Sequence, residues 1–192
     1  MNEQEKPIAL REWAVAVRAL EEGRQAIVLR KGGIAEETRE FRLESNRFYL
    51  FPSFEHQKPH LIKPEASETL AATQAEAAEF PGKVRITSYA EVVEDIEITD
   101  AETLRRLDGL HIWTEDYAEE RLKWKRTKPL HVLLLRVYGL SAPIDIPMQE
   151  SYAGCKSWLR LEEELPPPKA EPILDDGTFD RIADSVRQAV KG

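Results

Sequence analysis

The chain has 192 residues, of which 42% are hydrophobic and 32% charged, and its formal net charge is −8. A chain of this length buries about two thirds of its unfolded surface, so it can fold without metals or disulfides. Cys155 is the only cysteine, which excludes an intrachain disulfide. The charged N-terminal segment does not resemble a signal peptide, and no apolar run approaches the roughly 20 residues that span a bilayer. We therefore expect a cytoplasmic protein with no membrane partner.

The charge is distributed unevenly along the chain. Residues 64–122 carry five cations against 15 carboxylates, a net charge of −10, whereas residues 123–160 carry seven cations against two carboxylates, a net charge of +5. Such a block permits a positive face on an acidic protein, although charge runs are usually only solvated surface. The basic block makes DNA or RNA a candidate partner.

The N-terminal third is expected to begin with a helix and to continue with short strands. Apolar residues recur at helical spacing over residues 8–22, and Gly23 favours the end of that helix. Apolar and aromatic runs predict strands at residues 25–30, 41–43 and 48–51. Lys31 and the two glycines after it interrupt the first strand, and Pro52 stops the last, because proline cannot donate to a ladder.

The middle of the chain is expected to hold three helices around one long strand. The helical segments lie at residues 64–79, 99–107 and 114–123. Thr99 and Glu102 form a capping-box pattern, and Thr114 stands at the cap position of the third helix. Residues 84–98 are rich in β-branched side chains and predict a strand with a bend near Ala90.

The last third is expected to supply two strands and a C-terminal helix. Residues 130–138 predict the strongest strand, placed centrally in the sheet, and residues 155–161 predict another. Asp176 can cap a helix with one apolar stripe, formed by Phe179, Ile182, Ala183, Val186 and Val190. That stripe must dock on the domain, on a partner, or on a second copy in a homo-oligomer.

These elements predict the α+β class, with a small, mixed, largely antiparallel β-sheet or barrel, flanking helices and a C-terminal helix. Residues 1–165 are expected to form one α+β domain. Residues 166–192 are expected to form a proline linker and the amphipathic helix.

No catalytic signature is present, so the catalytic residues stay unknown. His56 and His60 have ligand spacing, but Pro59 disfavours a helix between them and one cysteine cannot build a structural zinc site. We therefore expect no metal and no cofactor. No lysine has Asp or Glu two residues before it, which argues against a nuclease core of the usual restriction-enzyme kind. A hydrolytic or small-molecule-binding enzyme that uses His56 with Glu55 or Cys155 stays an alternative.

Two parts of the sequence could contact a nucleic acid. Arg30 and Lys31 enter a glycine turn that could cradle an anion, and His56 follows a strand, where sites are often built. A later segment mixes aromatic rings with cations, as surfaces that stack bases do. Its candidate residues are Trp113, Lys123, Trp124, Lys125, Arg126 and Lys128. Solvated cations beside ordinary aromatic core packing would explain the same residues.

Five motifs occur in an order that resembles a known family. They are Arg11-Glu-Trp-Ala-Val15, Leu29-Arg-Lys-Gly-Gly-Ile34, Phe51-Pro52 with Glu55-His56-Gln57, Leu135-Arg-Val-Tyr138 and Gly154-Cys155-Lys-Ser-Trp158. The chain resembles the bacterial domain-of-unknown-function family 1802 over about residues 8–161. Some relatives are associated with an Mrr-type restriction endonuclease domain, which implies a role in restriction or foreign-DNA handling beside a separate nuclease subunit.

The order of elements is also similar to that of PUA-like barrels, including those that recognise nucleobases. This likeness would place Arg30, Lys31, His56 and the aromatic and basic segment around a cleft that could hold an extruded base. The leading hypothesis is a non-enzymatic nucleic-acid recognition domain that senses a base. The alternatives are the enzyme described above and an interaction module that docks through the C-terminal helix.

Overall fold

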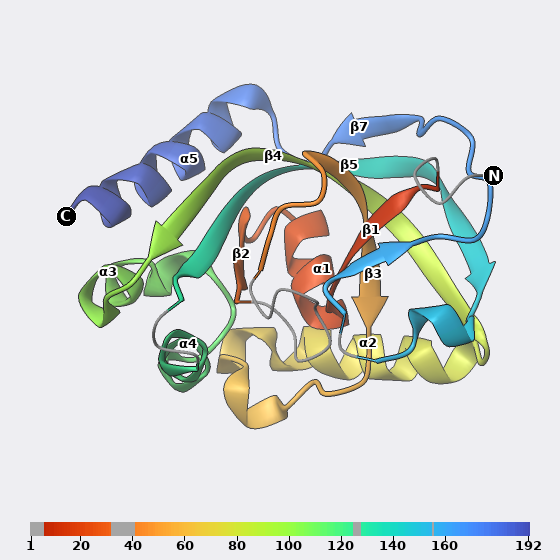
Figure 1. Cartoon of the computed structure of the whole chain (residues 1–192), viewed down its shortest axis with the longest axis horizontal. Helices are drawn as coiled ribbons and strands as arrows, with labels where there is room; N and C mark the ends of the chain where they lie inside the picture. The colour runs from red at the N-terminus through yellow and green to blue at the C-terminus, as the bar shows by residue number, and fades with distance from the viewer. Residues whose placement is uncertain (1–5, 32–40, 125–127, 155) are drawn as a thin grey trace.

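The computed structural model describes residues 6–31, 41–124, 128–154 and 156–192. Seven strands form one curled sheet in the order β2-β5-β4-β3-β1-β6, and β7 pairs with the middle of β5 (Figure 1). The strands are β1 (Ile8–Trp13), β2 (Ile27–Arg30), β3 (Arg47–Ser53), β4 (Lys83–Ile98), β5 (Leu130–Pro147), β6 (Trp158–Arg160) and β7 (Ala170–Pro172). The helices are α1 (Ala14–Glu21), α2 (Ser67–Glu79), α3 (Ala101–Arg106), α4 (Glu115–Lys123) and α5 (Asp176–Lys191).

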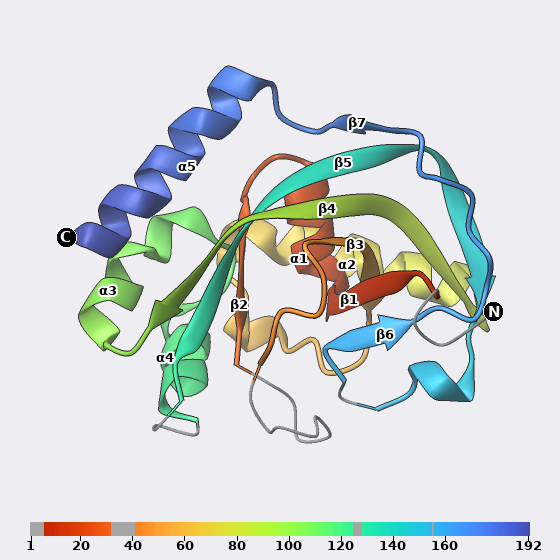
Figure 2. The ribbon, with the colours of Figure 1, turned by 45° about the horizontal axis from the view of Figure 1, so that its top comes forward.

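The long β4–β5 ribbon gives the sheet its curvature. The two strands pair antiparallel from Lys83 opposite Pro147 to Ile98 opposite Leu130, and the register shifts twice, on either side of Ala90. An extra residue in one strand bends the ladder and increases its twist, so the ribbon arches over the rest of the molecule (Figure 2). The bend predicted near Ala90 is therefore confirmed. The parallel pair of the sheet joins β1 to β3.

The core fills the concave side of this half-barrel. Helix α1 lies inside the arch and buries six of its eight residues, and α2 runs along the outer side of α1 (Figure 1). Strands β2 and β5 supply long aliphatic runs in which almost every side chain is buried, as in a sheet that is covered on both faces. The α+β class with a largely antiparallel, barrel-like sheet, flanking helices and a C-terminal helix is confirmed.

The apolar stripe of α5 packs on the chain's own domain. Phe179, Ala183 and Val186 are buried, and the helix contacts β5 and α3. The Arg136 guanidinium lies 4.7 Å above the centre of the Phe179 ring, and β7 ties the preceding segment to β5. Of the three docking places that the sequence left open, this structure shows the intramolecular one. A homo-oligomer built through the same stripe would require α5 to leave the sheet.

Several local predictions were wrong. The predicted helix over residues 8–22 is helical only from Ala14, because residues 8–13 form β1 between β3 and β6. Residues 41–43 form no strand, although Phe41 is buried.

Thr114 caps α4 as predicted, by accepting from the Tyr117 backbone N–H at 3.3 Å.

The two other predicted caps are displaced by one residue. Asp100, rather than the Thr99 and Glu102 pair, accepts from the backbone N–H of Thr103 at 2.8 Å. At the start of α5, Asp175 rather than Asp176 accepts from Thr178. Both observed caps are aspartates three residues before their donor, which is the usual geometry of a helix start.

In the described part of the chain, no helix is both long enough and apolar enough to cross a bilayer.

Candidate functional site

A cleft of about 510 Å³ opens where the curled sheet fails to close on itself. Its walls are the ends of β1, β2 and β3, helix α4, and the segment that leads into β6. Strands β2 and β6 stand at opposite ends of the strand order, so side chains rather than ladder hydrogen bonds span the gap between them. The mouth of a β-barrel is a common place for a ligand site, and the volume falls within the roughly 300–1,000 Å³ of such sites.

Among the described residues, cations outnumber carboxylates around this hollow, which we call the cationic cleft. The six cations are Arg11, Arg30, Lys31, Lys58, Arg121 and Lys156. The three carboxylates are Glu12, Glu55 and Glu120. A chain whose net charge is −8 therefore gathers a positive excess at this one opening. An opening of this sign attracts anionic ligands.

Arg30 ties the end of β2 to the opposite wall. Its Nη1 donates to Glu12 Oε2 over 3.2 Å, and its Nη2 donates to Ser157 Oγ over 2.6 Å. Glu12 is only 2% exposed and also accepts from the Trp13 backbone N–H, 2.8 Å away. Charged hydrogen bonds in a dry environment are stronger than those in water, so these contacts fix the geometry of the cleft floor.

Lys31 is the most buried cation of the cleft, with 2% of the residue exposed. Its Nζ donates to the Leu122 carbonyl in the last turn of α4, where helix carbonyls lack partners within the helix. Among the described residues, no carboxylate lies within 4.0 Å of this ammonium group, and burial lowers its pKa below the usual 10.5. An ammonium group has three N–H donors, so it can still donate to an anion in the cleft.

Three aromatic rings line the same space. The Trp13 and Tyr117 rings meet edge to face with centroids 5.1 Å apart, and the Arg121 guanidinium lies 5.2 Å from the Tyr117 centroid. Tyr117 is buried, and burial raises the pKa of its hydroxyl. Trp13 and Trp124 are only partly buried. The cleft therefore combines two partly exposed indole rings with a fixed aromatic support.

Four of the predicted contact residues meet at this cleft: Arg30, Lys31, His56 and Trp124. They come from three segments that are far apart in the sequence. Lys123 does not line the cleft; it is exposed on α4 and pairs with Glu119 at 3.2 Å. Lys128 is exposed just before β5, and Lys125 and Arg126 lie outside the described residues.

The stacking role predicted for Trp113 is wrong. Its side chain is 0% exposed, and its ring stacks on Tyr117 with centroids 5.2 Å and planes 11° apart. A ring without an exposed face cannot receive a base. Trp113 instead supports the cleft from behind, through Tyr117 and Trp13.

Glu55 and His56 lie at the rim rather than in a catalytic pocket. Their side chains are 82% and 71% exposed, and His56 Nε2 is 4.0 Å from Glu55 Oε2. His56 also has a φ of +67°, a conformation that is uncommon outside glycine. Solvated groups lack the burial that activates a catalytic pair, so the geometry gives the hydrolytic hypothesis no support. Its other candidate, Cys155, lies outside the described residues.

No cluster that suits a metal ion is found among the described residues, where no group of three or more His, Cys, Asp or Glu side chains converges. His56 and His60, the pair with ligand spacing in the sequence, are both exposed.

Four cations and one indole ring of the cleft were not among the predicted contact residues. They are Arg11, Trp13, Lys58, Arg121 and Lys156. None of these four cations has another cation next to it in the sequence. Arg11 and Trp13 lie in a segment that was predicted to be helical. One signal could have found most of them, because four of the five family motifs contribute residues to this cleft. Motifs that are distant in sequence and meet at one opening indicate a shared site.

The fold and the site together define a class: an α+β domain with a half-open barrel whose mouth is cationic and lined with aromatic rings. The chain belongs to the family described as a domain of unknown function, DUF1802, whose model matches residues 9–185. This match extends well beyond the predicted limit near residue 161. It includes β7 and more than half of α5.

Solved structures of the ASCH protein from Zymomonas mobilis are similar to this chain. One has a TM-score of 0.48 at 14% identity, and the match covers 84% of this chain and 90% of that chain. Two mutant forms of it have TM-scores of 0.47 and 0.44, also at 14% identity, covering 83% and 93% of this chain and 92% and 95% of theirs. No curated protein matches the sequence.

Proposed function

We propose that the chain binds single-stranded nucleic acid and holds one unstacked base in the cationic cleft. The observation that carries the proposal is the meeting of two partly exposed indole rings with six cations at one opening. Every base has a face that can stack on an aromatic ring, and every phosphate attracts a cation, so this combination suits single strands. Stacking of one base on such a ring contributes about 1–3 kcal/mol.

The cleft residues divide into two groups by the part of the ligand they would contact. Trp13 and Trp124 offer ring faces to the base, while the rim cations face the phosphates. Among the described residues, Lys58, Arg121 and Lys156 have no carboxylate within 4.0 Å, so their charges are available to a polyanion. A base inside a duplex is stacked on both faces, so a base that enters the cleft must come from a single strand or be extruded.

Four cations lie next to Trp124 in the sequence. Lys123, Lys125, Arg126 and Lys128 stay predicted phosphate contacts, because they are close neighbours of Trp124 in the sequence. We infer that the domain recognises nucleic acid without cutting it. The association of relatives with a restriction nuclease makes a separate nuclease subunit the predicted partner, which the recognition domain would direct to its target.

Fluorescence anisotropy with labelled single- and double-stranded DNA and RNA tests the proposal across a salt series. We expect binding to single strands that weakens with salt, and a loss of affinity of about tenfold in Trp124→Ala. The double variant Lys58→Ala/Lys156→Ala should reduce the slope of log affinity against log salt by about 1.4, since each phosphate contact contributes about 0.7 on single strands.

A matched control separates contact from general charge. Lys169→Ala/Lys191→Ala also removes two exposed lysines but lies away from the cleft, so its salt slope should equal that of the wild type. Equal slopes in both double variants, or no binding of any nucleic acid at low salt, would overturn the proposal.

A further inference from the structure

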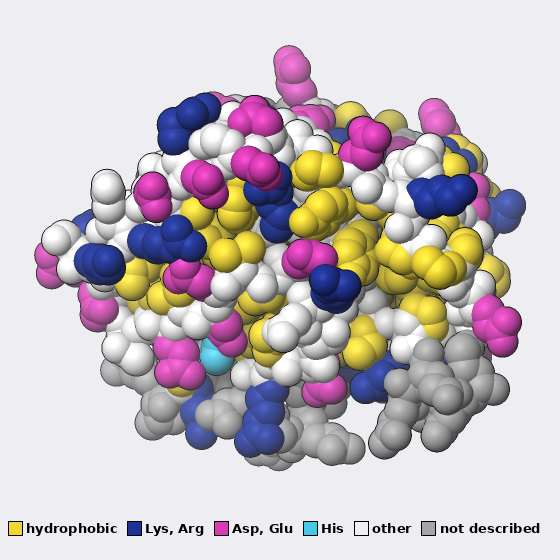
Figure 3. Space-filling view, turned by 90° about the horizontal axis from the view of Figure 1, so that it is seen from above, with side chains coloured by type: hydrophobic (Ala, Val, Ile, Leu, Met, Phe, Trp, Pro, Cys, Tyr) yellow, Lys and Arg dark blue, Asp and Glu magenta, His cyan; other side chains and the backbone are white. Residues whose placement is uncertain are grey.

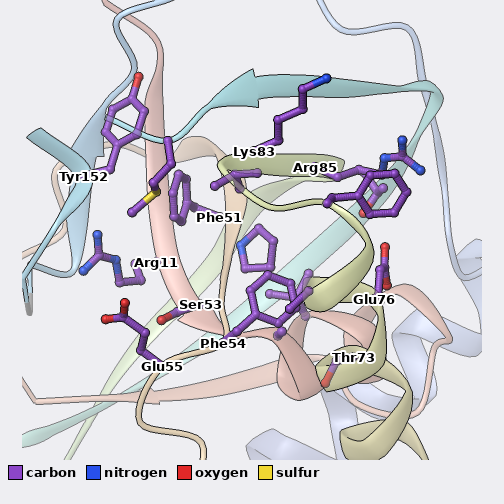
Figure 4. Close-up of a pocket in the computed structure, with 18 of the residues that line it drawn as sticks. Arg11, Phe51, Ser53, Phe54, Glu55, Thr73, Glu76, Lys83, Arg85 and Tyr152 are labelled. Atoms are coloured by element: carbon purple, nitrogen blue, oxygen red, sulfur yellow. The ribbon is translucent and has the colours of Figure 1, made fainter. Parts of the chain in front are cut away.

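A second cavity, of about 280 Å³, adjoins the cationic cleft at the end of β3 (Figure 4). The two hollows share four lining residues: Arg11, Ser53, Glu55 and Gly154. They therefore meet along one boundary, made by the end of β1, the end of β3 and the segment before β6. A chain-like ligand that leaves the cleft across this boundary enters the second cavity directly.

The second cavity also combines aromatic rings with cations, and its Arg18 and Arg85 pair with Glu76 and Asp145 at 2.6 and 2.7 Å. Figure 4 shows Phe51 and Phe54 in the hollow between Arg11 on one side and Arg85 on the other. Phe54 and Phe80 are partly exposed, and the Arg85 guanidinium lies 4.2 Å above the Phe80 ring. Arg85 is held there by Asp145, with hydrogen bonds of 2.7 and 2.9 Å. Aromatic faces again lie beside cations, as in surfaces that stack successive bases.

Arg11 marks the boundary between the two hollows. Its Nη1 donates to the carbonyl of Gly154, and its guanidinium lies 5.7 Å from the centre of the Phe51 ring. The planar guanidinium group is well suited to phosphate because its donors match two phosphate oxygens. A phosphate that links a nucleoside in the cleft to a nucleoside in the second cavity would have to pass this residue.

We propose that the second cavity takes the nucleoside next to the one held in the cationic cleft, so that the domain binds two successive positions of one strand across Arg11. This inference rests on the proposed function. The continuity of two aromatic-lined hollows through a cation favours one polyanionic strand over an unrelated apolar molecule. Met148, which is 44% exposed and lines the second cavity, supplies a further apolar surface for the second base.

Photo-crosslinking locates successive bases on the wild-type protein, without amino-acid substitutions. Single-stranded octanucleotides with 5-iodouracil at one position each are irradiated with the full-length chain, and the modified peptides are mapped by mass spectrometry. We expect one position to crosslink near Trp13 or Trp124 and an adjacent position to crosslink near Phe54, Phe80 or Met148. Crosslinks that never reach the second cavity would overturn the inference.

Affinity measurements provide the second arm. Phe54 lines only the second cavity and Trp124 only the cleft, so Phe54→Ala and Trp124→Ala separate the two hollows. We expect each to weaken octanucleotide binding by about tenfold, with Phe54→Tyr close to wild type. Thermal melting verifies the fold of each variant. If Phe54→Ala unfolds, Met148→Ser replaces it, because Met148 is exposed. For Met148→Ser we expect octanucleotide affinity to fall by a few-fold.

The outcomes distinguish the two proposals. Loss in Trp124→Ala with unchanged affinity in Phe54→Ala and Met148→Ser would remove the second cavity from the binding site and leave the proposed function in place. Absence of octanucleotide binding by the wild type would overturn both.

Discussion

The cationic cleft and the surface over α5 differ in how their cations are neutralised. On the α5 side, Arg187 pairs with Glu94, and Arg136 pairs with Asp176 at 2.8 Å. Figure 3 shows acidic and basic side chains interspersed over this face. In the described part of the cleft, three lysines have no carboxylate within 4.0 Å: Lys31, Lys58 and Lys156. A surface is suited to an anionic ligand when its cations lack carboxylate partners, and the number of cations alone does not decide this.

The largest expected effect contrasts one ion pair from each region. Arg30→Ala leaves the Glu12 carboxylate buried at 2% exposure without its cation, which should lower the free energy of unfolding by about 3–5 kcal/mol. Arg187→Ala breaks a pair whose side chains are 39% and 36% exposed, and should cost at most about 1 kcal/mol. Urea denaturation at pH 7 measures both losses. Equal losses would show that the Arg30 pair is as well solvated as the surface pair.

A second effect concerns the aromatic support behind the cleft. His111 is 6% exposed beside Trp113, and burial together with the Lys63 charge lowers its pKa to about 4. The unfolded chain therefore binds a proton at a higher pH than the folded chain does. Stability should fall as the pH drops from about 6.5 to about 4, by up to about 3 kcal/mol.

The control for this pH dependence is His111→Gln, which keeps the polar character but does not titrate in this window. Urea midpoints measured between pH 4 and pH 7 should fall more steeply for the wild type than for the variant. Parallel curves would show that other groups cause the acid sensitivity.

The smallest effect on stability should come from Lys31, the buried lysine of the cleft. Lys31→Met removes a buried charge that has no counter-ion, which offsets the loss of its hydrogen bond to the Leu122 carbonyl. We expect the free energy of unfolding at pH 7 to change by less than about 1 kcal/mol. Octanucleotide affinity should nevertheless fall, which separates a ligand-directed charge from a structural one.

The pH dependence of Lys31 has the opposite direction to that of His111. Burial lowers the pKa of Lys31 in the folded state, so the unfolded chain retains the proton as the pH approaches 10.5. Wild-type stability relative to Lys31→Met should therefore rise with pH in the window below 10.5. A difference that stays constant across this window would contradict the burial of the charge.

Local sequence patterns determined much of the secondary structure. The β-branched run of β4, the aliphatic run of β5, the Thr114 cap and the apolar stripe of α5 each predict their element correctly, because those signals lie within a few residues of one another. The apolar residues of β1 led to a wrong prediction, that of a helix. Their spacing also fits a helix, and only pairing with β3 and β6 makes the segment a strand.

The candidate site was predictable in part. Arg30, Lys31, His56 and Trp124 were identified from glycines, strand ends and neighbouring cations, and the structure brings them to one cleft. Trp113 looked equivalent to Trp124 in the sequence. Burial separates them, because one ring packs behind Tyr117 and the other reaches the opening.

The sequence by itself determined the α+β class, the family and the residue types available for binding. Only the tertiary structure decided which described cations stay without carboxylates and which rings are buried. The physical reason is that pairing and burial depend on distances between segments far apart in the chain. The curvature of the β4–β5 ribbon and the unclosed edge between β2 and β6 set those distances.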